Sequence, residues 1–442
     1  MRVYRHPVVI VLLSVLVIGA CKATKSPSSK TQSSGPPAPM EYTAAREGLP
    51  KSRIWKSQIA FGDINNDGCA DLGAVSRLAD GPFIFKGDCK GDWTDASAGL
   101  PRESYCGGGM SFGDANGDGK TDVAIADHCK GVFVYFGDGT GNWRNASAGL
   151  PTVGSEDVDF GDFNKDGCLD VAIVAASEEG VRAFKGDCKG VWKESSKGLS
   201  QTEWGNSVVI RDVDADGNMD VIAAYSAGPR VWLGDGKGGW KEASEGMPAP
   251  DIHGLYWGIA VGDVNGDGKL DVASGAAIPG AEVFIQEAGP TGPRWRKASE
   301  GIIPMNALGV ALGDLNNDGK TDLVVAGKAN LEEIGGVYGV FPFLGDGTGN
   351  WKLVDNTGLP TDGRERTWGA NVADINNDGV LDIGVAFGDV LAPTWRSGAA
   401  KKAADQKKEE KDKDDAQKKK KSNPDRGMFG AIEVWKGTLS TK

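Results

Sequence analysis

Short apolar runs of four or five residues recur along most of this chain, and turns rich in Gly and Asp separate them. Val123–Ala126, Val132–Phe136 and Leu323–Ala326 are clear cases. Runs of this length between turn residues predict β-strands. A further strand in most units opens on a tryptophan, at Trp93, Trp143, Trp192, Trp240, Trp295 and Trp351. We expect these six rings to pack between neighbouring units rather than to bind a ligand.

The units repeat with a nearly constant period. One loop motif recurs seven times, and its first aspartates are 51, 48, 50, 51, 51 and 60 residues apart. A period in this range, with four short strands in each unit, is typical of the blades of a propeller. We therefore predict an all-β fold over residues 41–442, a seven-bladed β-propeller of four-stranded antiparallel blades.

The last unit lacks a fourth strand, because the chain stops soon after the third, Glu433–Lys436. Near the other end, residues 42–50 (YTAAREGLP) closely match the fourth-strand segment 93–101 (WTDASAGLP). We expect this N-terminal strand to complete the last blade. Closure of the ring in this way removes open sheet edges.

The recurrent loop reads Asp-x-Asn/Asp-x-Asp-Gly-x-x-Asp. Ca²⁺ prefers six to eight hard oxygen ligands, and a chain that curls around it needs a sharp turn at the Gly. An EF-hand would have Glu at position 12 and flanking helices, whereas these loops have Asp at position 9 and flanking strands. The alternative is a purely structural turn. We predict up to seven Ca²⁺ ions, held by Asp63, Asn65, Asp67, Asp71, Asp114, Asn116, Asp118, Asp122, Asp162, Asn164, Asp166, Asp170, Asp212, Asp214, Asp216, Asp220, Asp263, Asn265, Asp267, Asp271, Asp314, Asn316, Asp318, Asp322, Asp374, Asn376, Asp378 and Asp382.

Calcium would also account for the acidity of the chain. The formal net charge is −12, and it becomes −14 when Arg2 and Arg5 leave with a signal peptide. Seven Ca²⁺ ions would bring the total near zero, whereas metal-free loops would hold mutually repelling carboxylates. The metals are therefore predicted to be structural.

The N-terminus predicts export. Arg2 and Arg5 precede an apolar run, Pro7–Ala20, that is too short to span a bilayer comfortably and ends at Cys21. This end resembles a bacterial lipobox, so we predict a signal peptide at 1–20, a lipidated Cys21 and a flexible Ser- and Pro-rich tether at 21–40. An ordinary cleaved signal and an uncleaved anchor are the alternatives. The expected location is a bacterial membrane, the outer membrane or cell surface, reached only through the lipid.

Six cysteines remain after Cys21, which suits an exported protein. Strands alternate in direction, so the first-to-second and third-to-fourth turns of every blade share one face, the loop face. The other connections share the opposite face. Cys69 and Cys168 sit in calcium loops, and Cys89 and Cys188 sit in third-to-fourth turns. We predict two disulfides on this basis, Cys69 with Cys89 and Cys168 with Cys188. A third, Cys106 with Cys129, is predicted because these two residues flank the second hairpin almost symmetrically about its loop.

The repeated Phe-Gly-Asp-x-Asn-x-Asp-Gly-x-x-Asp unit resembles the FG-GAP/VCBS repeat, found in integrin α-subunit propellers, bacterial surface proteins and some fungal lectins. The resemblance covers residues 41–442 apart from one insert. It implies the propeller and the metal, but not the ligand, because the family binds proteins and sugars and is sometimes attached to enzymes. Units four to seven depart from Phe at the opening position, with Ile210, Val261, Leu312 and Val372, all apolar.

The opposite face collects aromatic residues that the repeat does not require. They lie just before the loops or nearby, and comprise Trp55, Tyr105, Trp204, His253, Tyr256, Trp257 and Trp368. Aromatic rings on a rim would suit sugar stacking or a protein hot spot. The alternative is that they pack at the mouth of the central channel.

An insert at 389–427 falls on the same face. Residues 401–421 hold ten Lys against six acids with no apolar period, which predicts a disordered, solvated excursion. A contact with anionic polysaccharide or lipid headgroups is the alternative.

A catalytic set is hard to find in this sequence. His128 and His253 belong to different blades, His6 lies in the signal, and no catalytic-serine elbow, HExxH or phosphate loop is visible. We expect a non-enzymatic, calcium-stabilised surface lipoprotein that binds a macromolecular partner in adhesion or as a protein scaffold, and no nucleic acid. A carbohydrate-binding lectin is the alternative, and a polysaccharide-degrading enzyme is less expected.

Overall fold

The structure of the protein is a computed structural model that describes residues 40–51, 54–176, 179–200, 202–248, 255–290, 292–331, 335–361, 366–388 and 431–439. All of them belong to one unit, Pro37–Lys442. The predicted signal at 1–20, Cys21, the tether apart from Met40, His253 and the insert at 389–427 lie outside the described residues.

Blade two shows how the repeat folds. Its strands are β9 (Gly108–Gly113), β10 (Asp122–Asp127), β11 (Gly131–Gly137) and β12 (Trp143–Asn145), paired antiparallel in that order. The apolar run Val123–Ala126 forms β10, which is buried along its whole length because it lies between two strands and two neighbouring blades. The strands predicted at Val123–Ala126 and Val132–Phe136 are confirmed, and each extends one residue further at both ends.

The same four-stranded order recurs in every blade of the described chain. The other six blades are β3 (Ala60–Gly62), β4 (Asp71–Val75), β6 (Pro82–Gly87), β7 (Trp93–Asp95); β13 (Ser155–Gly161), β14 (Asp170–Ala175), β15 (Val181–Gly186), β16 (Trp192–Glu194); β17 (Gly205–Arg211), β18 (Asp220–Tyr225), β19 (Gly228–Gly234), β20 (Trp240–Glu242); β21 (Tyr256–Gly262), β22 (Asp271–Ala276), β23 (Ala281–Ala288), β24 (Pro293–Lys297); β25 (Met305–Gly313), β26 (Asp322–Leu331), β27 (Gly335–Gly345), β28 (Trp351–Leu353); and β29 (Thr367–Ala373), β30 (Asp382–Phe387), β31 (Ile432–Leu439), β1 (Met40–Ala44).

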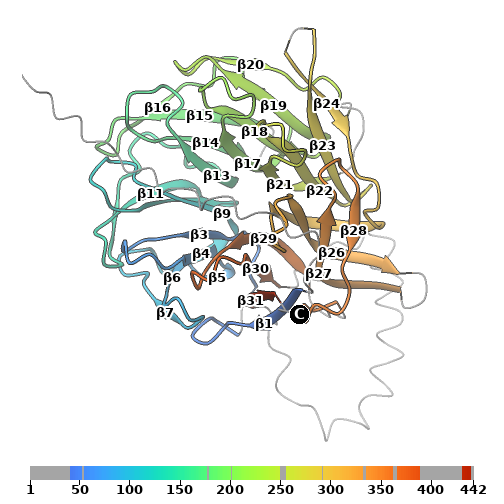
Figure 1. Ribbon diagram of the computed structural model, residues 1–442. Coiled ribbons are helices and arrows are strands. Elements are labelled where there is room, and N and C mark those ends of the chain that lie inside the picture. Colours follow the sequence, from blue (N-terminus) through green and yellow to red (C-terminus); the bar gives the residue numbers. More distant parts are fainter. Residues whose placement is uncertain are drawn as a thin grey trace, which may run out of the picture. The chain divides into compact units, whose positions relative to one another are not determined.

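The first strand of each blade lies nearest the centre of the ring (Figure 1). These inner strands contact one another in sequence, β3, β9, β13, β17, β21, β25, β29 and back to β3. Two short pairings on the opposite face supplement the blades. β2 (Ser57–Gln58) runs parallel to β9, and β5 (Arg77–Asp80) pairs with β8 (Ser104–Cys106). The seven-bladed propeller is therefore confirmed.

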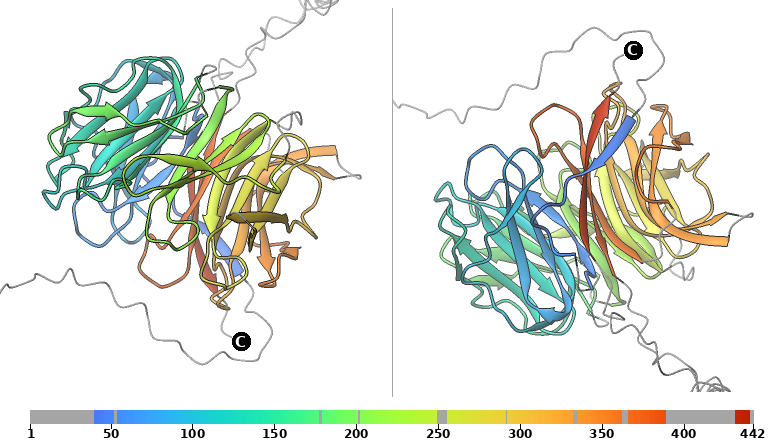
Figure 2. Two further views of the ribbon diagram at one scale, coloured as in Figure 1. Left: turned by 90° about the horizontal axis from the view of Figure 1, so that it is seen from above. Right: turned by 90° about the horizontal axis from the view of Figure 1, so that it is seen from below.

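The ring closes through the N-terminal strand. β1 pairs antiparallel with β31, from Met40 opposite Leu439 to Ala44 opposite Trp435, and the two strands lie side by side in Figure 2. Tyr42 also donates its backbone N–H to the carbonyl of Thr357 in blade six, at 2.7 Å. The strand exchange predicted from residues 42–50 is confirmed.

Tryptophans hold neighbouring blades together. Each indole N–H donates to a backbone carbonyl in the exit segment of the preceding blade, at 2.7–2.9 Å. The pairs are Trp93 to Ala45, Trp143 to Ala96, Trp192 to Ala146, Trp240 to Ser195, Trp295 to Ala243, and Trp351 to Ala298. Tyr42 takes the place of the tryptophan in blade seven, and its buried hydroxyl has no hydrogen-bond partner. The predicted packing of the six rings between blades is confirmed.

The described cysteines form the three predicted disulfides. Cys69 pairs with Cys89 and Cys168 with Cys188, each linking an aspartate loop to the turn between the third and fourth strands. Cys106 pairs with Cys129 on the opposite face. Each bridge closes a loop of 20 or 23 residues, for which chain entropy predicts a stabilisation of about 3 kcal/mol.

The closure predicts that a chain beginning at Lys51 is much less stable than one beginning at Met40. The shorter chain loses the burial of Met40, Tyr42 and Leu49, worth about 1.5–3 kcal/mol for each large side chain, and leaves β31 as an open edge. Thermal unfolding followed by circular dichroism measures the difference. Equal melting temperatures in the two chains would contradict closure by β1.

The inter-blade hydrogen bonds predict a contrast between two substitutions. Trp143→Phe should lower the free energy of unfolding by about 1–3 kcal/mol, because it leaves the Ala96 carbonyl without its donor. Tyr42→Phe, at the equivalent position, should be neutral or stabilising, because it removes a hydroxyl that has no partner. Urea titration of both variants tests the contrast, and a larger loss in the tyrosine variant would refute it.

Candidate functional sites at the aspartate loops and the channel mouth

Backbone N–H groups orient the oxygens of each aspartate loop. In blade two, the Asp114 carboxylate accepts the N–H groups of Gly117, Asp118 and Gly119 at 2.8–3.1 Å. The N–H of Asp118 also reaches the Asn116 side-chain oxygen at 2.9 Å, so the oxygens of positions 1 and 3 converge. Gly119 at position 6 has φ of 80°, a left-handed conformation that strains other residues.

The aspartate at loop position 9 makes different contacts from the side chains at positions 1, 3 and 5. One of its oxygens accepts the N–H of loop position 2, and the other accepts an N–H near the end of the third strand. In blade two these donors are Ala115 and Gly137, at 2.9 and 2.8 Å from Asp122. The same two bonds occur in all seven blades at 2.7–3.0 Å, made by Asp71, Asp122, Asp170, Asp220, Asp271, Asp322 and Asp382. These carboxylates are at most 1% exposed, so they tie loop and sheet together.

The loops concentrate negative charge where water is scarce. Burial raises the pKa of Asp122 to about 7, and the charges of Asp118 and Asp114 act in the same direction, against two N–H donors that lower it. In blade four, carboxylate oxygens of Asp212, Asp214 and Asp216 all lie within 4.8 Å of one another. Converging hard oxygens in an acidic loop fit a divalent cation such as Ca²⁺. Such an ion would bind positions 1, 3 and 5 and relieve their repulsion.

A narrow cavity of about 30 Å³ opens where the inner strands begin, on the opposite face. It is the mouth of the central channel. Every blade contributes the residue six positions before its first loop aspartate, which gives Ser57, Gly108, Glu156, Asn206, Trp257, Leu308 and Trp368. Lys56, Gln58 and Gly369 complete the lining.

A charged cluster joins three blades at this mouth. Lys56 Nζ lies 2.8 Å from a carboxylate oxygen of Glu156, and His128 Nδ1 contacts the other oxygen. Although burial opposes ionisation of Glu156, Lys56 and His128 hold its pKa below the ordinary value. Lys56 Nζ also lies 5.9 and 5.8 Å from the ring centroids of Trp257 and Trp368. Glu156 is therefore a charged anchor at the channel mouth.

The predicted aromatic rim is only partly available to a ligand. Trp55, Tyr105 and Tyr256 are 0%, 1% and 1% exposed, so the expectation that their rings face a ligand is corrected. They fill the apolar space between blades, where burial of a large ring stabilises the fold more than exposure. Trp368 is 7% exposed and Trp257 half-buried.

Trp204 is 37% exposed, and its ring contacts His128 at 5.4 Å between centroids. It is the most accessible of the predicted aromatic residues that the structure describes. Sequence reasoning missed Lys56, His128 and Glu156 as parts of this site, because it selected aromatic residues only. A register count from the loop aspartates would have found Glu156, since it stands six positions before Asp162 as Trp257 stands before Asp263.

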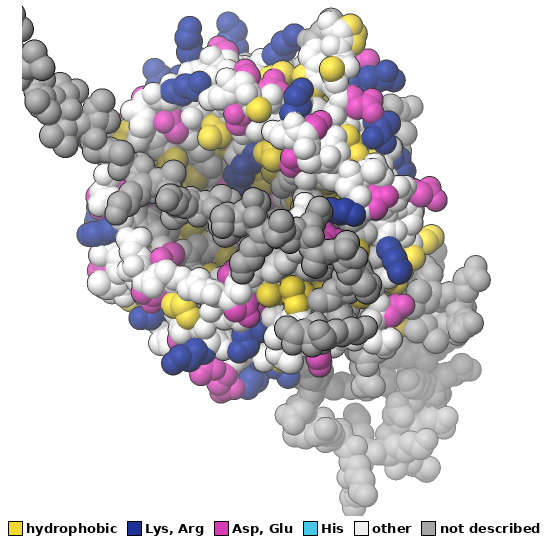
Figure 3. Space-filling model, in the orientation of Figure 1, with side chains coloured by type: hydrophobic (Ala, Val, Ile, Leu, Met, Phe, Trp, Pro, Cys, Tyr) yellow, Lys and Arg dark blue, Asp and Glu magenta, His cyan; other side chains and the backbone are white. Residues whose placement is uncertain are grey.

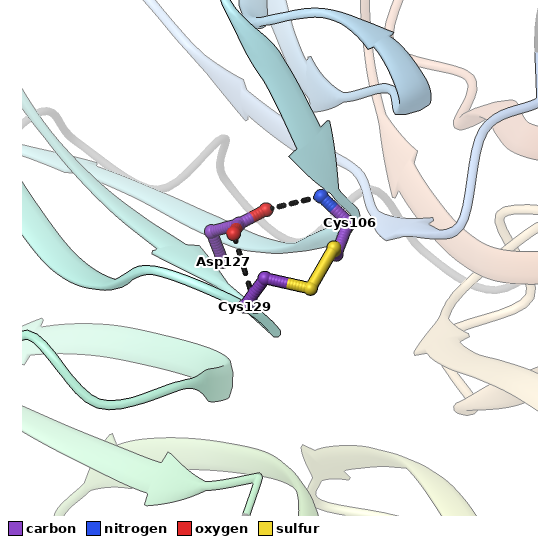
Figure 4. Close-up of side chains that lie close together, drawn as sticks. All are labelled: Cys106, Asp127 and Cys129. Carbon is purple, nitrogen blue, oxygen red and sulfur yellow. Dashed lines mark hydrogen bonds between the residues drawn. A yellow bond between two sulfur atoms is a disulfide. The ribbon is translucent and has the colours of Figure 1, made fainter.

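The carboxylate of Asp127 braces the edge of this site (Figure 4). It accepts the backbone N–H groups of Cys106 at 2.6 Å and Cys129 at 3.0 Å. The two sulfurs are joined in a disulfide and are not available as metal ligands. The bridge and the carboxylate together fix the connection that carries His128.

Comparison with known protein families identifies the repeats. The family model of the FG-GAP-like repeat matches residues 114–173, 212–274 and 314–385. A comparison with curated proteins gave no match.

Solved structures resemble the chain at low identity. A lectin of Agrocybe aegerita, which recognises non-reducing terminal N-acetylglucosamine, is 16% identical with a TM-score of 0.43, over 75% of this chain and 90% of that one. BBS1N, solved in complex with ARL6DN, is 11% identical with a TM-score of 0.50, over 79% and 94%. Raptor of Chaetomium thermophilum is 11% identical with a TM-score of 0.49, over 91% of this chain and 29% of that one. These identities speak to fold alone. The chain therefore contains FG-GAP-like repeats and has the fold of a seven-bladed β-propeller.

Proposed function

We propose that this propeller is a non-enzymatic binding protein whose opposite face contacts a protein partner. The observation that carries the proposal is an exposed apolar arc, defined as Trp204, Leu255 and Ile278, which are 37%, 48% and 74% exposed. Exposed aromatic and aliphatic side chains gathered at one place are typical of protein interfaces.

Backbone hydrogen bonds link the three connections that carry the apolar arc. Ser226 donates to the Trp204 carbonyl, Leu255 to the Ser226 carbonyl, and Ala277, next to Ile278, to the Leu255 carbonyl. Leu255 has φ of 52°, a conformation that disfavours a branched side chain. Strained residues that the surrounding structure retains are frequent at functional sites.

The distribution of the other exposed apolar side chains supports the same face. Among the described residues, five large apolar side chains are exposed, and four of them stand on connections of the opposite face: the apolar arc and Val153. Val191, 53% exposed, stands in a turn on the loop face. Elsewhere Figure 3 shows Lys and Arg interspersed with Asp and Glu over the visible face.

The proposal assigns no catalytic role to the channel mouth. His128 Nδ1 contacts one oxygen of Glu156 and Lys56 binds the other, so the carboxylate is engaged by two basic partners in an arrangement expected of a structural ion cluster. A lectin is the second candidate, because the half-buried ring of Trp257 lines the channel mouth beside the amides of Gln58 and Asn206. Rings flanked by amides are suited to sugars.

The proposal includes structural calcium in the aspartate loops and attachment to a membrane through a lipid on Cys21. The aspartate loops have the oxygens and the excess charge that a structural Ca²⁺ would offset. No helix in the described ranges has the length and apolar character needed to cross a membrane. The lipobox-like Cys21 supports attachment to a bacterial membrane through lipid.

Removal of calcium should lower the melting temperature of the whole propeller. Each ion that binds only the folded state contributes about 2.7 kcal/mol when free Ca²⁺ is about 100 times its dissociation constant. Calorimetry with excess chelator, followed by addition of Ca²⁺ or of Mg²⁺ as a control, measures the effect. A melting temperature that does not respond to chelator would exclude structural calcium.

Loop four offers a matched variant for this measurement. Asp214→Asn installs the amide that the other six loops carry at position 3. Burial and the charges of Asp216 and Asp212 raise the pKa of Asp214, so its ionised form destabilises the metal-free fold. The variant should melt higher than the parent in chelator and gain less on addition of Ca²⁺. The opposite order would contradict the repulsion.

Loss of the apolar arc should weaken capture of the partner. The double variant Trp204→Ala, Leu255→Ser is compared with Val191→Ser, which removes an exposed valine from the loop face. The partner is identified by cross-linking to the calcium-loaded parent and then measured by pull-down. We expect at least about a tenfold loss for the double variant, since interface hot spots carry about 2 kcal/mol or more, and no loss for the control.

A glycan array distinguishes the lectin. Sugar binding that is abolished by Trp257→Ala and retained without the apolar arc would replace the protein partner by a carbohydrate. Binding of the protein partner that survives the double variant would refute the role of the arc.

A further inference from the structure

The junction of blades one and seven holds unusual orphan donors. Seven buried side-chain polar atoms of the described residues have no hydrogen-bond partner, and four of them meet here. They are Trp55 Nε1, Arg77 Nε, Arg366 Nε and Thr367 Oγ1. A buried N–H or O–H without an acceptor destabilises the fold, and four such donors lie together at this junction.

Backbone contacts bring these four residues to one place. The N–H of Trp55 donates to the Phe387 carbonyl, and Phe387 pairs with Thr367. Gly388 donates to the Arg366 carbonyl, and Arg77 donates to the carbonyl of Ile54, which precedes Trp55. The junction opens on the opposite face, because β2, β5 and the start of β29 all lie at that end of their blades.

The same junction carries three cationic side chains, Lys56, Arg77 and Arg366. Glu156 forms an ion pair with Lys56, and its charge also acts on Arg77. Glu156 is already bound by Lys56 and His128. The structure shows no ion pair for Arg77 or Arg366 within its described ranges. Burial lowers the pKa of Arg77. The charge of Glu156 raises this pKa and the charge of Arg366 lowers it, so the two guanidinium groups repel each other.

This cationic junction is continuous with the apolar arc. The guanidinium of Arg366 lies 4.5 Å from the ring centroid of Trp368, and Lys56 lies 5.8 Å from the same ring. Lys56 binds Glu156, Glu156 contacts His128, and His128 contacts the ring of Trp204. A chain of side-chain contacts therefore links the apolar arc to two arginines for which the described residues provide no ion pair.

We propose that Arg77 and Arg366 bind a carboxylate from an acidic segment of the protein partner. The proposal deepens the proposed function and rests on it for the nature of the partner. Guanidinium groups present planar sets of N–H donors that match a carboxylate, and an incoming carboxylate would balance the positive charge of the two half-buried arginines. The chain as a whole carries a net charge of −12 and repels such a segment, so attraction would be confined to the cations of this junction.

An acidic peptide fits this surface better than an acidic polysaccharide. A sugar would need a free ring face for stacking. Trp55 is fully buried, and Trp368 is 7% exposed with two cations against its ring. The neighbouring exposed side chains are aliphatic or indole groups of the apolar arc, which suit the apolar residues beside an acidic side chain in a protein.

The test uses a fluorescein-labelled (Gly-Glu)4 peptide and the full calcium-loaded chain at low salt. Anisotropy should show binding that falls as salt increases. Arg77→Gln and Arg366→Gln should each weaken binding about tenfold or more, the loss expected when a charged hydrogen bond worth about 1.5–3 kcal/mol is removed. Arg366→Lys, which keeps the charge and loses the planar fork, should weaken it less. Arg144→Gln, on the exposed outer strand β12, should leave it unchanged.

The controls separate the outcomes. A (Gly-Gln)4 peptide should not bind, and equal binding of both peptides would overturn the proposal. Binding that is unaffected in Arg77→Gln and in both Arg366 variants would also overturn the proposal. Melting curves show whether each variant is folded. Polygalacturonate that binds through the two arginines while the Glu peptide fails would assign the junction to an acidic polysaccharide and overturn the peptide. The double variant Trp204→Ala, Leu255→Ser should keep peptide binding, so failure of the apolar arc and failure of the arginine pair are distinguishable.

Discussion

The buried ninth-position aspartate is the constraint on which every blade depends. One oxygen of its carboxylate accepts a backbone N–H from the loop after the first strand, and the other accepts an N–H from the end of the third strand. Because this carboxylate lies inside the sheet, its partners cannot be replaced by water, and seven blades repeat the bonds with nearly the same lengths. The six tryptophans and Tyr42 then set the spacing from blade to blade. Regular repetition on the loop face follows from these two contacts.

The opposite face has no such repeated requirement. Its connections differ in length and composition, and the residue six positions before the loop is Ser, Gly, Glu, Asn, Trp, Leu or Trp in successive blades. A fold that fixes one face by backbone chemistry leaves the other free to vary, and recognition needs such variation. The charged cluster of Lys56, His128 and Glu156 and the apolar arc both stand on the variable side.

The fold could be predicted from the sequence because its determinants are local and repeated. The loop motif predicted the blades, the tryptophans predicted the fourth strands, and the match of residues 42–50 to 93–101 predicted β1. The positions of the cysteines within the repeats predicted the disulfides. The candidate site resisted prediction because it is assembled across blades. Trp55 is buried and Trp204 is exposed, although both precede a loop aspartate by eight residues. Their exposure depends on how neighbouring blades pack, which the local sequence does not indicate. Arg77 and Arg366 are nearly 290 residues apart in the sequence and meet only when the ring closes.

The direction of β1 determines how the ring is presented. Met40 stands opposite Leu439, beyond the point where Gly437 bonds Asp382, so the polypeptide enters the propeller at the loop face and runs toward the opposite face. The polypeptide that precedes β1 therefore joins the propeller on the side that holds the acidic loops, and the channel mouth lies at the other end of the blades.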